Sequence, residues 1–311
     1  MSNPKWKAID PNIAFFPVDL RPLYMEATGS SEDQNDLFTA NGLVKLDRHQ
    51  AVVDTDEGKV FAVVTDDYEL ITNEQAYEQA KDVMTKVFNM TTIDDMDCLN
   101  ITMPSTRSFC HIDLIHKGAD FSPWETDKWT AFIRITNSYN RTRRLRFELG
   151  FCRWICLNGM IFGSKSIEFS YAHTRRGKEK IDRFIENIGD IRKLEASLTE
   201  KLHNLERFYV PEKHMLATLC RAFQISVKPD VAQKEKRKEE LLALREQTKL
   251  LSNSYFSEIG PNGYAALNVL TDYASRPKGV ISEESSINGL QHKASSWMEE
   301  FIQEIQRPSF S

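Results

Sequence analysis

The sequence has few cysteines and no long hydrophobic run. Only five of its 311 residues are Cys, an odd number without the regular spacing of a disulfide framework. We therefore expect reduced thiols and a reducing, cytoplasmic environment. No apolar stretch approaches the roughly 20 residues of a membrane-spanning helix, and the first residues, MSNPKWKAIDPN, lack the apolar core of a signal peptide. These absences predict a protein without membrane association.

Familiar signatures of catalysis and metal binding are also missing. The chain contains no Gly-x-Ser-x-Gly, no Gly-x-x-x-x-Gly-Lys-Ser/Thr and no His-Glu-x-x-His. Cys152 and Cys156 would lie about 13 Å apart along an extended strand, too far to share one zinc ion. We expect a protein that is not an enzyme and that needs neither a cofactor nor a metal.

Positive charge is not in excess overall. The formal net charge is −5, so an anionic partner would have to be bound by a local patch. Hydrophobic residues make up 41% and charged residues 27% of the chain, as in soluble globular proteins. The length allows one large domain or two modest ones.

Residues 43–170 carry the patterns of an α+β domain with an antiparallel sheet and one packed helix. Alternating residues predict strands on both sides of a turn at Asp54–Gly58, and again over residues 99–103 and 109–115. Thr72 and Gln75 form a capping box that opens a helix with one apolar face. Residues 1–42, with prolines and an acidic loop, are expected to form an extended arm and loop.

Residues 171–311 are predicted to be mostly helical and to pack on that domain. One long helix is expected over residues 177–209, with apolar residues near heptad spacing between Ile181 and Leu205. This 181–205 stretch could form a homo-oligomer interface or could pack on the sheet. The charged helix around Lys234 to Arg245 is expected to be solvated.

The central feature is a hairpin between Lys128 and Gly163. Alternation on both sides of Asn137-Ser138-Tyr139-Asn140 predicts two paired strands. With a turn near Tyr139, Arg134 would lie opposite Arg144 and Arg146, a destabilising arrangement unless an anion joins them. Asn158-Gly159 is expected to form a tight turn with positive φ, with the Asn158 amide holding the backbone or touching a ligand.

Basic residues concentrate on this hairpin and just after it. Arginine binds phosphate well because its planar fork is always charged, and aromatic rings can stack on unpaired bases. The alternative is a solvated sheet face whose arginines pair with acidic residues such as Glu148. The candidate nucleic-acid-binding residues are Arg134, Tyr139, Arg141, Arg143, Arg144, Arg146, Arg153, Trp154, Arg175, Arg176, Lys178 and Lys180.

The hairpin also carries a recognisable motif. Asn137-Ser138-Tyr139 is followed by Arg153, Cys156, Asn158 and Gly159 in the pattern Arg-x-x-Cys-x-Asn-Gly. This combination resembles a phage- and plasmid-borne family catalogued as domain of unknown function 932, and the resemblance extends over roughly residues 44–274. The family usually has Asp-Gly-Ser after the aromatic residue, whereas this chain has the more basic Asn140-Arg141-Thr142. The resemblance implies a mobile genetic element in a bacterial host cell.

Together these patterns predict a non-catalytic protein that binds single-stranded DNA or RNA in replication, recombination or viral transcription. The alternative is a phage protein that inhibits or redirects a host protein, in anti-defence or host takeover. The sequence does not choose between DNA and RNA.

Overall fold

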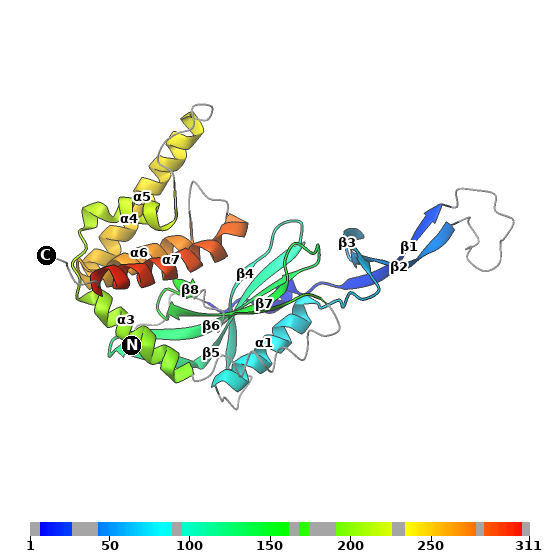
Figure 1. Cartoon of the computed structure of the whole chain (residues 1–311), viewed down its shortest axis with the longest axis horizontal. Helices are drawn as coiled ribbons and strands as arrows, with labels where there is room; N and C mark the ends of the chain where they lie inside the picture. Colours follow the sequence, from blue (N-terminus) through cyan, green and yellow to red (C-terminus); the bar gives the residue numbers. More distant parts are fainter. Residues whose placement is uncertain are drawn as a thin grey trace.

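The described residues of the computed structural model are 7–26, 43–88, 95–161, 168–173, 191–225, 234–277 and 283–306. They form two antiparallel sheets and a set of helices (Figure 1). The small sheet contains β1 (Val18–Glu26), β2 (Leu43–Asp54) and β3 (Lys59–Thr65) and projects from one end of the molecule. The predicted α+β class is confirmed, but β1 lies within residues that were expected to form only an arm and loop.

The large sheet follows in the order β4 (Met96–Thr102), β5 (Phe109–Trp124), β6 (Asp127–Ser138), β7 (Leu145–Arg153) and β8 (Gly159–Ile161). A further strand, β9 (Glu168–Tyr171), pairs with β7. Helix α1 (Asn73–Phe88) contacts β5 and β6. The predicted capping box begins α1, since Gln75 N donates to Thr72 Oγ1 at 3.1 Å and Thr72 N donates to Gln75 Oε1 at 2.9 Å.

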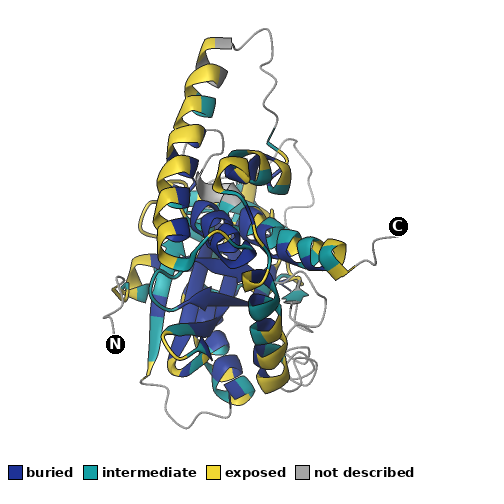
Figure 2. Ribbon diagram, turned by 90° about the vertical axis from the view of Figure 1, so that its left-hand side faces the viewer, coloured by how far each residue is buried: buried dark blue, intermediate teal, exposed yellow. Residues whose placement is uncertain are grey.

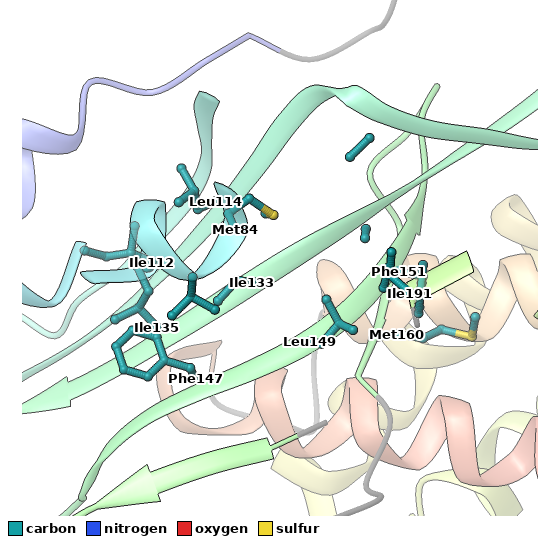
Figure 3. Close-up of a cluster of buried hydrophobic side chains, with 14 of the residues drawn as sticks. Met84, Ile112, Leu114, Ile133, Ile135, Phe147, Leu149, Phe151, Met160 and Ile191 are labelled. Carbon is teal, nitrogen blue, oxygen red and sulfur yellow. The ribbon is translucent and has the colours of Figure 1, made fainter. Parts of the chain in front are cut away.

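The apolar face of the large sheet forms the main core with α1. Alternate residues of three strands point to this face, because successive side chains of a strand point to opposite sides. Figure 3 shows them beside Met84 of α1. The sheet residues labelled there include Ile112, Leu114, Ile133, Ile135, Phe147 and Leu149, all at most 1% exposed.

The remaining helices are α3 (Ile191–Glu206), α4 (Met215–Ala222), α5 (Lys234–Ile259), α6 (Gly263–Ser275) and α7 (Glu283–Gln306), with short 3-10 turns at Pro11–Ala14 and Glu212–His214. Every residue of α6 from Gly263 to Ala274 is buried, and Figure 2 shows this helix in the interior while much of α5 is exposed. Helix α6 is therefore the centre of the helical layer.

The apolar row of α3 is used within the chain. Leu198, Leu202 and Leu205 are at most 2% exposed and belong to the main core. The described part of the predicted 181–205 stretch thus packs on the rest of the molecule, and residues 181–190 lie outside the described residues. A homo-oligomer through this stretch stays a prediction.

Two predictions about the central hairpin are wrong. Arg134 is paired with Glu148 in the β6–β7 register, and Arg146 is paired with Thr136, so no like charges oppose each other there. The sharp exit from β7 is made by Leu157 with φ 53°, whereas Gly159 begins β8. Gly159 is constrained by space instead: a Cβ there would lie 3.1 Å from Gln291 Nε2 and 3.2 Å from Phe132 Cε1.

Candidate nucleic-acid interface

Arg134 is buried and cannot be part of an exposed phosphate-binding surface. It is 1% exposed, and its Nε and Nη2 donate to the two carboxylate oxygens of Asp113 at 2.6 and 2.5 Å. Nη1 donates to Gln291 Oε1 of α7 at 2.6 Å. Burial disfavours the charge, but Asp113 outweighs burial and raises the pKa of Arg134. This arginine joins the polar face of the sheet to α7.

Tyr139 and Arg153 are buried as well, contrary to their predicted role. The Tyr139 hydroxyl accepts a hydrogen bond from Asn73 N at 2.8 Å, and its ring packs between Phe16 and Phe61. Arg153 is 6% exposed and donates to Asp127 at 2.8 Å and to Glu258 at 2.7 Å. Both side chains are used to join elements of the fold.

The other candidates lie in three places: in the turn that joins β6 to β7, in or after β7, and among residues that are not described. Arg141 and Arg144 are exposed, and Arg143 and Arg146 are half-buried. Trp154 is half-buried after β7. Arg175, Arg176, Lys178 and Lys180 lie outside the described residues.

The β6–β7 turn is held by Asn140, whose side-chain oxygen accepts from Thr142 N at 3.1 Å, from Thr142 Oγ1 at 2.6 Å and from Ser138 Oγ at 2.8 Å. An Asn side chain that bonds the backbone two residues later stabilises a tight turn. Arg141 adopts φ 62° at the tip. Arg141, Arg143 and Arg144 are therefore all held on this one turn.

A cavity of about 420 Å³ lies beside this turn, and we call it the turn pocket. Its walls come from the end of β3 and the residues after it, from the β6–β7 turn, and from two residues that follow β9. The lining residues are Val64, Thr65, Asp67, Tyr68, Arg141, Thr142, Arg143, Arg144, Ala172 and His173. The volume is in the range of small-ligand sites.

Three polar side chains of the turn pocket hold buried atoms without a hydrogen-bond partner among the described residues. These atoms are Arg143 Nη1, Tyr68 Oη and both ring nitrogens of His173. His173 is 7% exposed and stacks on Tyr68, with ring centroids 5.3 Å apart. Because a buried polar group without a partner costs roughly 1–3 kcal/mol, these atoms favour a ligand that satisfies them.

Burial controls the charge of these groups. It lowers the pKa of His173, an effect that a hydrogen bond with the Glu69 backbone partly opposes. Burial also raises the pKa of Tyr68 to about 12, an effect that Arg141 partly opposes. Burial, followed by the neighbouring charge of Arg146, lowers the pKa of Arg143. The Arg143 guanidinium also lies over the Phe109 ring at 3.6 Å from its centroid, which fixes its position.

The motif residue Asn158 belongs to a second, fully bonded network. Its Nδ2 donates to Tyr255 Oη, and its Oδ1 accepts from Arg276 Nη2 at 2.7 Å. Tyr255 Oη and Arg276 Nη2 also contact Asp272 Oδ2 of α6, at 2.7 and 2.9 Å. The predicted bond to neighbouring backbone is replaced by a connection between the sheet and α5 and α6.

A cavity of about 520 Å³ borders this network, lined partly by Cys152, Cys156 and Asp272. Unlike the turn pocket, it contains none of the buried unpartnered side-chain atoms found in the described chain. Asp113, Asp272 and Gln291, which line it, are bonded to other side chains of the protein, which favours a structural role.

The cysteines and other metal-binding residue types form neither a disulfide nor a metal-binding cluster in the described ranges. All five cysteines are unpaired, and burial raises the pKa of Cys98 and Cys110 to about 12. No three His, Cys, Asp or Glu side chains among the described residues could hold a metal ion. None of the described helices is long and apolar enough to cross a bilayer.

Residues 60–297 match the family model described as domain of unknown function, DUF932. The chain belongs to the DUF932 family. The match begins in β3 and ends in α7, so both the turn pocket and the Asn158 network lie within the DUF932 region. No curated protein and no solved structure matches the chain.

Tyr68 and His173 were missed as candidate residues. They are separated by more than 100 positions, and neither stands in a motif. They meet because Glu69 N donates to His173 O at 3.1 Å. No local sequence pattern indicates that these two residues lie beside the arginines of the turn.

Proposed function

We propose that this protein binds single-stranded nucleic acid without catalysing a reaction, and that the contact is made at the turn pocket. The strand would serve replication, recombination or transcription of a phage or plasmid in the bacterial cytoplasm. The observation that carries the proposal is the group of unpartnered atoms of Arg143, Tyr68 and His173 beside the exposed Arg141 and Arg144.

The chemistry of the turn pocket suits a nucleotide. Arg141 and Arg144 can contact backbone phosphates and release counterions, which gives binding that weakens as salt rises. Arg143 and the Tyr68–His173 pair add hydrogen-bond donors and ring surface at the wall, the combination by which single strands are held. A volume of about 420 Å³ is compatible with one nucleotide at a time.

Titration of labelled oligonucleotides tests the proposal. Single- and double-stranded DNA and RNA of equal length are compared by fluorescence anisotropy at several salt concentrations. We expect single strands to bind more tightly than duplexes and the affinity to fall with salt. Absence of binding to every oligonucleotide, at low salt as well, would reject nucleic acid as the partner.

A second candidate function is binding of a host protein, in anti-defence or host takeover. The small sheet supports it, because this projecting element exposes Tyr24, Met25, Val60 and Val63 by 44–57% of their surface. Four of the eight large apolar side chains that are exposed in the described chain lie on this sheet, and exposed apolar groups can mark an interaction site. If the purified chain retains one discrete host protein, and no longer does so when Val60 and Val63 become Ser, this candidate is favoured.

A further inference from the structure

A ring of contacts ties the walls of the turn pocket to one another. Arg141 Nη1 donates to Val63 O at 3.4 Å, which joins the turn to β3. Leu145 pairs with Tyr171, which joins the start of β7 to β9. The contact from Glu69 N to His173 O completes the circuit back to β3.

A ring of this kind favours an inserted group over a strand that passes through. A groove that follows a continuous backbone is open at both ends, whereas here all three walls are tied to one another. The buried atoms of His173 and Tyr68 lie among the least exposed groups of the pocket. A ligand that reaches them must insert a polar group into the pocket.

The charges of the turn pocket match a doubly charged anion. Three arginines line it, and Asp67 is the one carboxylate among its lining residues. The net charge of these four side chains is +2 when His173 is neutral. A terminal phosphate monoester carries about −1.5 to −2 charges at pH 7 and three acceptor oxygens, whereas a phosphate inside a strand is a singly charged diester.

The unpartnered donors match those oxygens in number. Arg143 Nη1, Tyr68 Oη and one ring N–H of His173 are three buried donors, of which the His173 ring also has a contact with the Glu69 backbone. A neutral imidazole donates through one nitrogen and accepts through the other. Hydrogen bonds to a charged acceptor are roughly twice as strong as those between neutral groups.

We propose that the turn pocket recognises the phosphorylated end of a single strand, with the terminal monoester bound by Arg143, Tyr68 and His173 and the following phosphates on Arg141 and Arg144. The inference rests on the proposed function and adds a preference for strand ends. It assigns Tyr68 and His173 as specificity-determining residues.

The test compares four single strands of one sequence and length. One carries a 5′-phosphate, one a 3′-phosphate, one has hydroxyls at both ends and one is circular. We expect one of the phosphorylated strands to bind about tenfold more tightly than the hydroxyl-ended strand, the size of one hydrogen bond to a charged group. The circular strand should bind like the hydroxyl-ended one.

Tyr68→Phe locates the preference, because it removes the hydroxyl and keeps the ring that stacks on His173. This variant should lose the preference, so that the phosphorylated and hydroxyl-ended strands bind it with equal affinity. Tyr209→Phe, at a 72% exposed tyrosine outside the turn pocket, is the matched control and should behave like the parent. Circular dichroism establishes that both variants are folded.

Each outcome decides the inference. Equal affinity of the parent for all four strands would overturn end recognition and leave the proposed function intact. A preference that survives Tyr68→Phe would overturn the assignment to this pocket. Absence of binding to all four strands would overturn both proposals.

Discussion

At the scale of single residues, His111 couples the fold to pH. It is 7% exposed, and its Nδ1 lies 2.8 Å from Thr136 Oγ1. Burial, together with the charges of Arg134, Arg143 and Arg146, lowers the pKa of His111 to about 3. In the unfolded chain a histidine has a pKa near 6.5.

Between these two values only the unfolded state binds the proton, so acid destabilises the folded protein. The free energy of unfolding should therefore fall by about 1.4 kcal/mol for each pH unit below 6.5, down to pH 3. Denaturant unfolding at pH 7, 6, 5 and 4 measures this slope. His111→Gln removes the titrating group, and the slope of this variant should be smaller by that amount.

The comparison between the two proteins isolates His111. His173, whose pKa is also lowered by burial, adds to the slope of both. If the free energy of unfolding falls with the same slope against pH in the parent and in His111→Gln, His111 is not neutral and buried in the folded protein.

Gly150 has little room for a side chain. A Cβ at this position of β7 would lie 2.4 Å from Phe132 Cζ and 2.6 Å from the carbonyl oxygen of Met160. Gly150→Ala should lower the free energy of unfolding by about 1–3 kcal/mol, because the Met160 backbone would have to move to make room for the Cβ. Denaturant unfolding provides the measurement.

Gly289→Ala is its control. Gly289 lies in α7 and a Cβ there meets nothing within 4 Å. Alanine at this site should leave stability unchanged or raise it by up to about 1 kcal/mol, since Ala favours helix. Equal effects of the two changes would show that the space around Gly150 is not limiting.

At the scale of secondary-structure elements, a charged row joins the large sheet to α7. Asp113, Arg134 and Glu148 occupy paired positions on β5, β6 and β7. From α7, Gln291 accepts from Arg134, and His292 Nε2 lies 2.8 Å from Glu148 Oε1. Burial opposes ionisation of Glu148, but the contact with His292 and the nearby arginines lower its pKa.

Removal of the central cation should be costly. Arg134→Met leaves Asp113 and Glu148 buried without it, a situation that costs about 3–5 kcal/mol of unfolding free energy. Adding Asp113→Asn removes one of the two unpaired buried carboxylates and should restore part of the stability. Arg144→Ala, an exposed arginine on the same hairpin, is the control and should stay within about 0.5 kcal/mol of the parent.

If Arg134→Met has an unfolding free energy as close to that of the parent as Arg144→Ala has, the charged row of Asp113, Arg134 and Glu148 is not important for stability. Chemical denaturation compares all three variants.

Local patterns predicted the elements well, but not what covers them. Alternation located β6 and β7, and Thr72 with Gln75 marked the start of α1, because these signals depend on neighbouring residues. The same alternation placed Arg134 on a polar face without indicating that this face is buried. Its cover, Gln291, is 157 positions away, and such contacts leave no local trace.

The same reason explains the mixed result for the candidate site. Arg141 and Arg144 are in a turn, where exposure follows from local structure. Tyr139 and Arg153 are at strand ends, and their contacts with Phe16, Phe61 and Glu258 come from other elements. The turn pocket itself depends on three segments far apart in the sequence.

At the scale of the whole molecule, the turn pocket lies where the small sheet joins the large one. Residues of β3 and of the β6–β7 turn share its lining. An acidic chain with a net charge of −5 would concentrate its phosphate contacts at this junction. Binding should then depend on few arginines.

The salt dependence of single-strand affinity tests this claim most directly. Arg141→Ala with Arg144→Ala removes two exposed arginines of the turn pocket and should leave stability almost unchanged. Arg221→Ala with Arg245→Ala changes the net charge equally on α4 and α5 and is the matched control.

We expect the turn variant to bind all sequences more weakly. Its slope of log K against log salt should be smaller by about 1.4, near 0.7 for each phosphate that is no longer neutralised. The α4 and α5 variant should keep the parental slope. A folded turn variant with the parental slope and affinity would contradict the turn pocket as the nucleic-acid interface.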